Sequence, residues 1–146
     1  MGVFSIWEAI AADPDFDFPN FHGRQAVLQD CWRARGRTAE QDAVRSILDK
    51  MHVRWTEAPK AREQTDFCGN SLYRPQPPRN PRLAPAHYAR DIAGKFESHS
   101  PEEQRAIMRD YCKVFGNAKV VCYCHYCFEG LQNGGVDGVH LAQWLF

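Results

Sequence analysis

The segment from residue 24 to residue 57 constrains the fold more than any other part of this 146-residue chain. Its first part, "RQAVLQD" (24–30), has an apolar centre and predicts a strand. Thr38 and Gln41 then have the spacing of a capping box, and the apolar residues behind them recur at helical intervals, which predicts a helix. "HVRWTE" (52–57) alternates apolar and polar residues as a second strand does. A strand, a helix and a strand in this order form a βαβ unit, so we expect a parallel sheet.

The segments around this unit extend the prediction to a single cysteine-rich α/β domain over residues 1–146. Residues 1–20 are expected to form a short helix, with Ser5 and Glu8 as its capping box, followed by an aromatic loop. Residues 58–85 hold six of the nine prolines and predict a long insertion loop, because proline interrupts both helices and strands.

The C-terminal part of the chain adds three more predicted elements. "APAHYARDIAGKF" (84–96) has the apolar spacing of a helix. Ser100, Pro101 and Glu103 mark the start of a further helix, with a capping serine and a proline at the first helical position. "AKVVCYC" (118–124) predicts another strand. The expected fold is therefore a mainly parallel open sheet with helices on both faces.

Composition argues against several classes of protein. Eighteen basic and eighteen acidic residues leave a net charge of zero, which provides no electrostatic reason to expect a nucleic-acid partner. The apolar runs are too short for a membrane span, and the first residues lack a secretory signal pattern. Six cysteines in such a chain favour a reducing compartment, here the cytoplasm, and metal or redox use over disulfides.

Four of the cysteines occur where predicted elements end. Cys124 and Cys127 form a C-x-x-C at the end of a predicted strand, Cys31 ends another, and Cys68 lies in a glycine-containing loop. Because parallel strands end along one edge of a sheet, Cys31, Cys124 and Cys127 can converge there, and Cys68 can join them if its loop folds over that edge. Such thiolates suit a soft metal, although free cysteines also pack as small apolar residues.

Three other residues near the motif or in the predicted helix before it also need an interpretation. Two of them, Cys122 and His125, allow a role at a metal centre or a purely structural one, and Cys112 is expected to be structural. The spacing of Cys122 allows a ligand, but strand alternation would point its side chain into the core. His125, between the motif cysteines, could tune a metal centre or supply a proton, or it could be an exposed turn residue. Cys112, inside a predicted helix, is expected to pack in the core.

The order of these features resembles the cysteine-rich CCG domain. That domain occurs in the B subunit of heterodisulfide reductase and in the iron–sulfur subunits of glycolate and lactate oxidation systems. Its pattern is a strand ending in Asp-Pro-Cys, a helix, a strand leading into Cys-Cys-Gly and, after a further helix, a hydrophobic strand running into C-P-x-C. "QDC" (29–31), "FCG" (67–69) and "VVCYCHYC" (120–127) match these three elements, and the resemblance covers residues 20–146. It implies an iron–sulfur centre, in some members a noncubane cluster that performs disulfide chemistry.

The chain departs from the family pattern at several positions. Phe67 stands where the family has the first cysteine of its pair, and Asp30 and His125 stand nearest the positions of its two prolines. The stretch from Cys68 to Cys124 is longer than the family's usual spacing, and relatives often carry two such domains where this chain has one. The four remaining thiolates would still suffice for a [4Fe–4S] cluster or a Zn²⁺ ion.

Three functions follow as alternatives. The first is a redox protein with a [4Fe–4S] cluster on the four cysteines, which relays electrons or reduces a disulfide with a partner protein or subunit. The second is a non-enzymatic protein that binds zinc through the same four cysteines. The third is a thiol oxidoreductase that cycles Cys124 and Cys127, although the glycines after Cys127 argue against the long helix that would lower a thiol pKa there. A single domain also suggests a homodimer.

Overall fold

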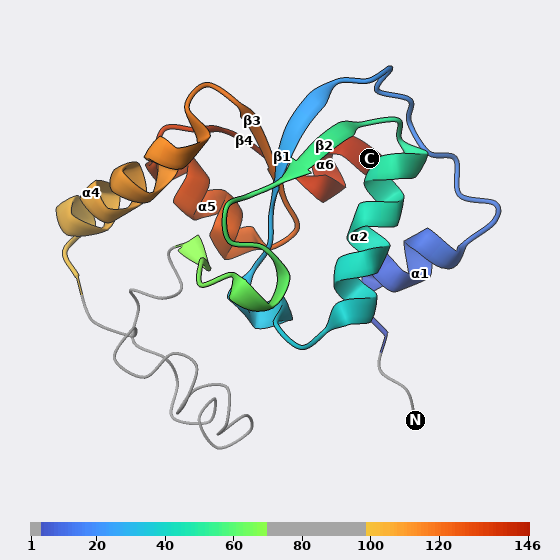
Figure 1. The fold of residues 1–146 in the computed structure, drawn as a ribbon, viewed down its shortest axis with the longest axis horizontal. Coiled ribbons are helices and arrows are strands. Elements are labelled where there is room, and N and C mark those ends of the chain that lie inside the picture. The colour runs from blue at the N-terminus through green and yellow to red at the C-terminus, as the bar shows by residue number, and fades with distance from the viewer. Residues whose placement is uncertain (1–3, 70–98) are drawn as a thin grey trace.

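The centre of the protein is a parallel β-sheet (Figure 1). The computed structural model describes residues 4–69 and 99–146, and within them four strands lie in the order β2-β1-β3-β4. These are β1 (Gln25–Gln29), β2 (Arg54–Glu57), β3 (Lys119–Cys122) and β4 (Asp137–His140), and every neighbouring pair is parallel. The chain runs outward from β1 to β2, returns to β3 beside β1, and then runs outward to β4. The predicted α/β class and parallel sheet are confirmed.

One face of the sheet is covered by α1 (Ile6–Ala12), α2 (Thr38–Lys50) and α6 (Leu141–Leu145), which share one apolar cluster with it. Figure 1 shows α1 and α2 together on this side of the sheet. The buried residues of α2 recur at helical spacing, as predicted, and those of β1 that face them alternate along the strand. They are Val44, Ile47 and Leu48 from α2 and Ala26 and Leu28 from β1.

The opposite face is covered by α4 (Pro101–Cys112) and α5 (His125–Asn133), so helices lie on both faces as expected. Met108 and Leu131 from these helices pack against Val120 and Cys122 of β3. Two short 3-10 turns, η1 (Trp32–Ala34) and η2 (Arg62–Gln64), follow β1 and β2, and a third, η5 (Lys113–Phe115), follows α4. The second apolar cluster contains most of the cysteines, so the candidate site belongs to this side of the sheet.

Local sequence signals place most, but not all, of the helix starts. The capping boxes at Ser5 and Ser100 are both formed, each with reciprocal backbone and side-chain hydrogen bonds to the glutamate three residues later. The box predicted at Thr38 is wrong, because Thr38 is already the first helical residue and Arg37 precedes it without a side-chain cap. Gln41 is instead 1% exposed, since its position on α2 turns it toward the protein interior.

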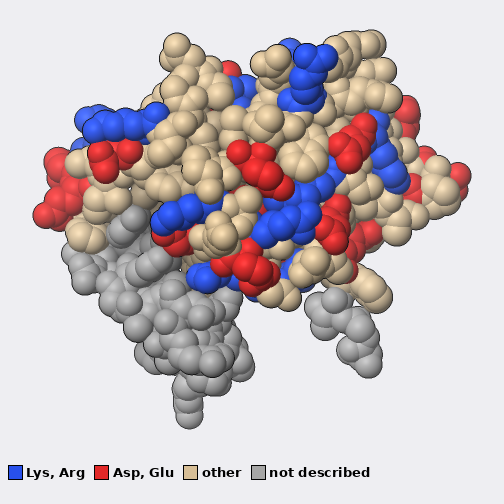
Figure 2. Space-filling view, in the orientation of Figure 1, with Lys and Arg blue, Asp and Glu red and all other residues tan. Residues whose placement is uncertain are grey.

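Part of the expected organisation lies outside the described residues. The proline-rich loop predicted over 58–85 is described only as far as Gly69, and the helix predicted over 84–96 is not among the described segments. No helix in the described ranges is long and apolar enough to cross a membrane. On the face shown in Figure 2, acidic and basic side chains are interspersed, so charge of neither sign dominates that surface.

Candidate metal centre

The candidate site lies between β1 and β3, where the strand order reverses: β2 is added on one side of β1, and β3 and β4 are added on the other side. Gln29 at the end of β1 is paired in register with Cys122 at the end of β3. Cys31 and Cys124 each follow two residues later, so the parallel register delivers both to the same edge. The carboxyl ends of the strands on either side of such a reversal are where open α/β sheets form their sites.

Four cysteines come together at this edge. The sulfurs of Cys31, Cys68, Cys124 and Cys127 all lie within 4.8 Å of one another, and Cys31 Sγ donates a hydrogen bond to Cys68 Sγ at 3.3 Å. Cys68 arrives on the segment after β2, and Cys127 lies in the first turn of α5. Three of the four are at most 3% exposed and Cys124 is half-buried. The convergence expected from the sequence is therefore present, and this group can hold a metal ion.

A backbone contact presses the Cys68 segment against the C-x-x-C turn. The N–H of Trp32 donates to the carbonyl of Phe67 at 2.9 Å, which ties this segment to the turn after β1. Gly69 follows in a left-handed conformation with φ +50°, and a Cβ there would overlap the carbonyl oxygen of Tyr126. A Cβ at Gly130 would lie 2.5 Å from the Cα of Gly69. Glycine is required at both positions because a side chain would push Cys68 away from Cys127.

The sequence argued against a long helix after Cys127, and the structure has a nine-residue helix that begins inside the C-x-x-C motif, at His125. α5 runs for nine residues, with Cys124 as its N-cap. The helix continues through Gly130, whose missing side chain allows the close approach of Gly69, and ends before Gly134. The Cys124 side chain makes no capping hydrogen bond at this helix start, but the nearby N–H of Cys127 is one of the groups that lower the pKa of Cys124.

The four thiols do not titrate alike. Hydrogen bonds from the thiols of Cys127, Cys31 and Cys68, together with the N–H of Cys127, strongly lower the pKa of Cys124. Burial and the hydrogen bond to Cys124 raise the pKa of Cys127, and donation to Cys124 raises that of Cys31. Burial raises the pKa of Cys68, but hydrogen bonds from Cys127 and Cys31 outweigh it and lower that pKa as well, so Cys124 and Cys68 ionise most readily. A cation that binds all four sulfurs must displace thiol protons from the others.

A buried carboxylate ties together the two strand ends that carry the cysteines. Asp30 is 0% exposed, and its Oδ1 accepts from the Tyr123 hydroxyl at 2.7 Å and from Arg45 Nη1 at 3.2 Å. Its Oδ2 accepts from Arg45 Nη2 and from the backbone N–H of Arg62, both at 2.7 Å. Burial opposes ionisation of Asp30, but these hydrogen bonds outweigh it and lower its pKa. Asp30 precedes Cys31 and Tyr123 precedes Cys124, so one carboxylate fixes both positions.

A second polar group extends this support to the Cys68 segment. Gln29 is fully buried, and its Nε2 donates to the carbonyl of Asp30 at 2.7 Å. Its Oε1 accepts from the Tyr111 hydroxyl at 2.7 Å, and the Tyr111 ring stacks on Phe67 with centroids 4.3 Å apart. Thr65 Oγ1 also donates to the Asp30 carbonyl at 3.1 Å. Phe67 thus has a packing role at the position where the resembled family has a cysteine.

These supporting residues were missed by sequence reasoning. The available signal was "QD" at the end of the apolar run "AVLQD", because two polar residues directly after a central strand must find partners if they are buried. Their partners come from distant parts of the chain. Tyr123 lies 93 positions after Asp30, and Tyr111 lies 82 positions after Gln29, so no local pattern connects them.

The two accessory candidates lie outside the group of four. Cys122 points into the core between the sheet and the helices, where its thiol lies 3.7 Å from the carbonyl of Val139 and burial raises its pKa. His125 is exposed and pairs with Glu129 at 3.1 Å on the outer side of α5. Cys112 packs in the core as expected, and burial raises the pKa of its thiol to about 11. Strand alternation accounts for Cys122, and the helical position of His125 turns it to solvent.

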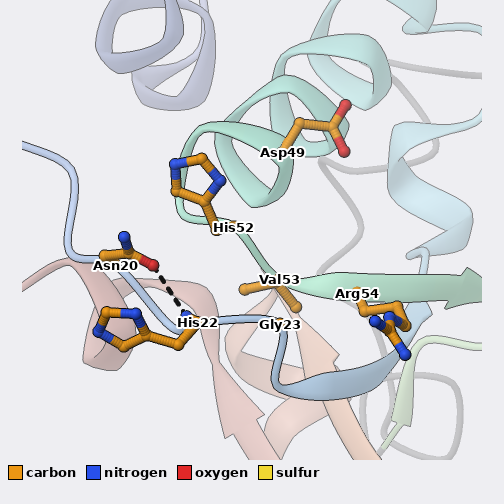
Figure 3. Close-up of a pocket in the computed structure, with 7 residues that line it drawn as sticks. All are labelled: Asn20, His22, Gly23, Asp49, His52, Val53 and Arg54. Carbon is orange, nitrogen blue, oxygen red and sulfur yellow. Dashed lines mark hydrogen bonds between the residues drawn. The ribbon is translucent and has the colours of Figure 1, made fainter.

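A hollow that is wide open to solvent lies at the opposite edge of the sheet, before β1 and β2 (Figure 3). Its volume is about 510 Å³, and His22 and His52 lie on its wall. The carboxylate of Asp49 points away from both imidazole rings and accepts from the Trp55 indole at 2.7 Å. Of the described residues, only the four cysteines form a group of three or more potential ligands. This hollow therefore provides no second metal site of that kind.

Comparison with models of known protein families, with curated proteins and with solved structures finds no significant match to this chain.

Proposed function

We propose that this protein binds one zinc ion through the thiolates of Cys31, Cys68, Cys124 and Cys127. The observation that supports a single ion is the separation of the sulfurs, all within 4.8 Å. Four thiolates bonded to zinc at about 2.3 Å form a tetrahedron with sulfurs about 3.8 Å apart. The sulfurs thus need only small movements to reach that geometry. When bound, the ion supplies a closed thiolate centre that joins three segments distant in sequence.

The surroundings of the thiols support this proposal. The four ligand candidates are held on a strand end, a loop and a helix start whose positions are set by buried hydrogen bonds and by the contact at Gly69. Such support around the ligands is typical of metal sites. All six cysteines are free, so the thiolate centre also requires a reducing compartment, and we propose the cytoplasm.

An iron–sulfur redox function is the second candidate. It is favoured by the fact that the three segments matching the CCG pattern, 29–31, 67–69 and 120–127, are the ones that meet at this site. In a [4Fe–4S] cluster each cysteine binds its own iron atom. The four cysteine sulfurs therefore lie further apart around a cluster than around a single metal ion. The half-buried Cys124 would bring such a cluster near a redox partner protein.

A thiol oxidoreductase is the third candidate, and the start of α5 favours it. Cys124 caps a nine-residue helix and has a lowered pKa, as attacking cysteines of C-x-x-C motifs do. This candidate differs from the other two in needing only Cys124 and Cys127. Replacing Cys31 or Cys68 with serine would then leave the reactivity of the pair in place.

Metal analysis of anaerobically purified protein separates the three. We expect zinc at about one equivalent per chain, falling to below about half in each of the serine variants of the four cysteines. Cys112→Ser and Cys122→Ser are matched controls, because both alter buried cysteines outside the group and should retain the zinc. A brown protein with iron near four equivalents would replace the zinc proposal with the iron–sulfur one. Metal-free protein that still exchanges Cys124–Cys127 disulfides would support the third candidate instead.

A further inference from the structure

One of the four cysteines is accessible from solvent. Cys124 is half-buried, whereas the other three are at most 3% exposed. A cavity of about 210 Å³ opens at the carboxyl edge of the sheet and has Cys124 on its wall. Cys31 is the other cysteine among the described residues that line it. A small reactant that enters this cavity therefore meets the sulfur of Cys124 first.

The four sulfurs are also close enough to form disulfides after small movements. All of them lie within 4.8 Å of one another, and Cys31 Sγ and Cys68 Sγ are 3.3 Å apart. Because a disulfide bond is about 2 Å long, these two sulfurs need to approach by only about 1 Å. Cys124 and Cys127 have the spacing of C-x-x-C disulfides, at the start of α5. The group thus divides into two pairs, Cys124 with Cys127 and Cys31 with Cys68.

We propose that this centre is also a site of reversible oxidation, at which hydrogen peroxide converts the four thiolates to two disulfides, beginning at Cys124, and so releases the metal ion. This inference rests on the proposed metal-binding function. Hydrogen peroxide is uncharged and little larger than water, so a cavity of about 210 Å³ admits it. Arg37 and Glu40 on the cavity wall pair with each other at 2.9 Å and need not separate.

The first disulfide consumes one molecule of peroxide. The Cys124 thiolate attacks one peroxide oxygen, an S–O bond forms, the O–O bond breaks, and hydroxide leaves into the cavity. A thiolate that displaces the second hydroxide must approach opposite the S–O bond, from the protein interior, where Cys127 is 0% exposed. The S–S bond then forms as the S–O bond breaks. Two electrons pass from the two sulfurs to the peroxide, and both hydroxides take protons from the buffer to become water.

The second disulfide follows from the loss of the first two ligands. With Cys124 and Cys127 oxidised, two of the four thiolates remain, and the affinity for the ion falls. Cys31 lies on the cavity wall, so a second peroxide molecule reaches it, and Cys68 displaces hydroxide from it in the same way. The start of α5 then has no link through the centre to the other two segments, whereas Cys31 and Cys68 are joined covalently.

Peroxide titration of the whole zinc-loaded protein tests this inference. A chromogenic chelator measures the zinc released, and peptide mass spectrometry identifies the disulfides. We expect about one zinc per chain to be released as about two thiols are lost, with Cys124–Cys127 as the first disulfide and Cys31–Cys68 as the second. Dimedone, which traps sulfenic acids, should label Cys124 first. A dithiol reductant and added zinc should restore the thiols and the bound metal.

Two variants make the test specific. Cys112→Ser and Cys122→Ser each remove a buried thiol outside the group of four, so both should release zinc at the rate of the unmodified protein. Zinc that stays bound in excess peroxide, or a first disulfide other than Cys124–Cys127, would overturn the inference. Unmodified protein that holds no zinc before peroxide is added would instead overturn the metal-binding function, and this inference with it.

Discussion

Replacing Asp30 with asparagine tests whether a buried carboxylate holds the cysteine-bearing strand ends together. The substitution keeps the size of the side chain and removes its charge. In the native protein each carboxylate oxygen accepts two hydrogen bonds, which come from Arg45, Tyr123 and the backbone of Arg62. An amide has one oxygen and a donating NH2 group, so at least two of these four donors lose their acceptor.

The loss of unfolding free energy expected for Asp30→Asn follows from the burial and the charge of the groups involved. Asp30 is 0% exposed and the Arg45 side chain is 6% exposed, so water cannot replace the lost acceptor. Each hydrogen bond to a charged group contributes about 1.5–3 kcal/mol, and two lost bonds therefore predict about 3–6 kcal/mol. Breaking a buried ion pair from one side typically costs about 3–5 kcal/mol, which agrees. Glu57 still pairs with Arg45 at 2.7 Å, so we expect a loss near the lower end, about 3–4 kcal/mol.

Urea unfolding of the reduced, metal-free protein measures this loss, with Asp42→Asn as the matched control. Asp42 pairs with Arg62 at 2.8 Å, but its side chain is 59% exposed, so the same substitution there should cost less than about 1 kcal/mol. If Asp30→Asn does not fold, Tyr123→Phe removes a single donor to the charged carboxylate and should cost about 1.5–3 kcal/mol. The reasoning is refuted if Asp30→Asn is no more destabilising than Asp42→Asn.

Because Asp30 ionises more readily in the folded protein than in the unfolded chain, the stability of the protein should depend on pH in a definite direction. The pKa of Asp30 is lower in the folded protein than in the unfolded chain, so its contribution is complete above the unfolded value of about 4. The contribution disappears as the pH falls through the lowered, folded-state pKa. We expect the stability difference between native protein and Asp30→Asn to be constant from pH 7 to about pH 5 and to shrink below about pH 4. A difference that grows as the pH falls would contradict this assignment.

Three further predictions concern the four-cysteine group. Gly69→Ala should reduce metal affinity at least about tenfold in competition with a chelator, because the added Cβ overlaps the Tyr126 carbonyl. Gly23→Ala is the control, since Gly23 also has a positive φ but faces open space. This variant should lose only about 1 kcal/mol of stability and keep the metal affinity unchanged. Cys122→Ala should retain one equivalent of metal in elemental analysis, and loss of metal would mean that its sulfur is a ligand. Removing the metal should lower the melting temperature. Adding free metal at about 100 times its Kd should raise the free energy of unfolding by about 2.7 kcal/mol. An unchanged melting temperature would show that the ion does not bind the folded chain in preference to the unfolded one.

Local patterns in the sequence determined most of the secondary structure considered above and the edge of the sheet at which two cysteines lie. The apolar centre of β1, the helical period of α2 and the alternation over 52–57 predicted a βαβ unit, and the capping boxes at Ser5 and Ser100 marked two helix starts correctly. Parallel strands in turn predicted that Cys31 and Cys124 would share one edge. These inferences succeed because helix period, strand alternation and capping involve residues a few positions apart, whose geometry the chain sets by itself.

The tertiary structure alone decided what surrounds those cysteines. Asp30 meets Tyr123 only because β1 and β3 pair, and Gly69 approaches α5 closely because Gly130 has no side chain there. Both sites depend on contacts between segments more than 60 positions apart, where the free energy of burial and hydrogen bonding overrides local propensity. The sequence by itself predicted Cys31, Cys124 and Cys127 at one edge of a sheet, with Cys68 joining them if its loop folds over that edge. Only the folded chain brought their sulfurs within reach of a single ion and left Cys124 open to a charged cavity.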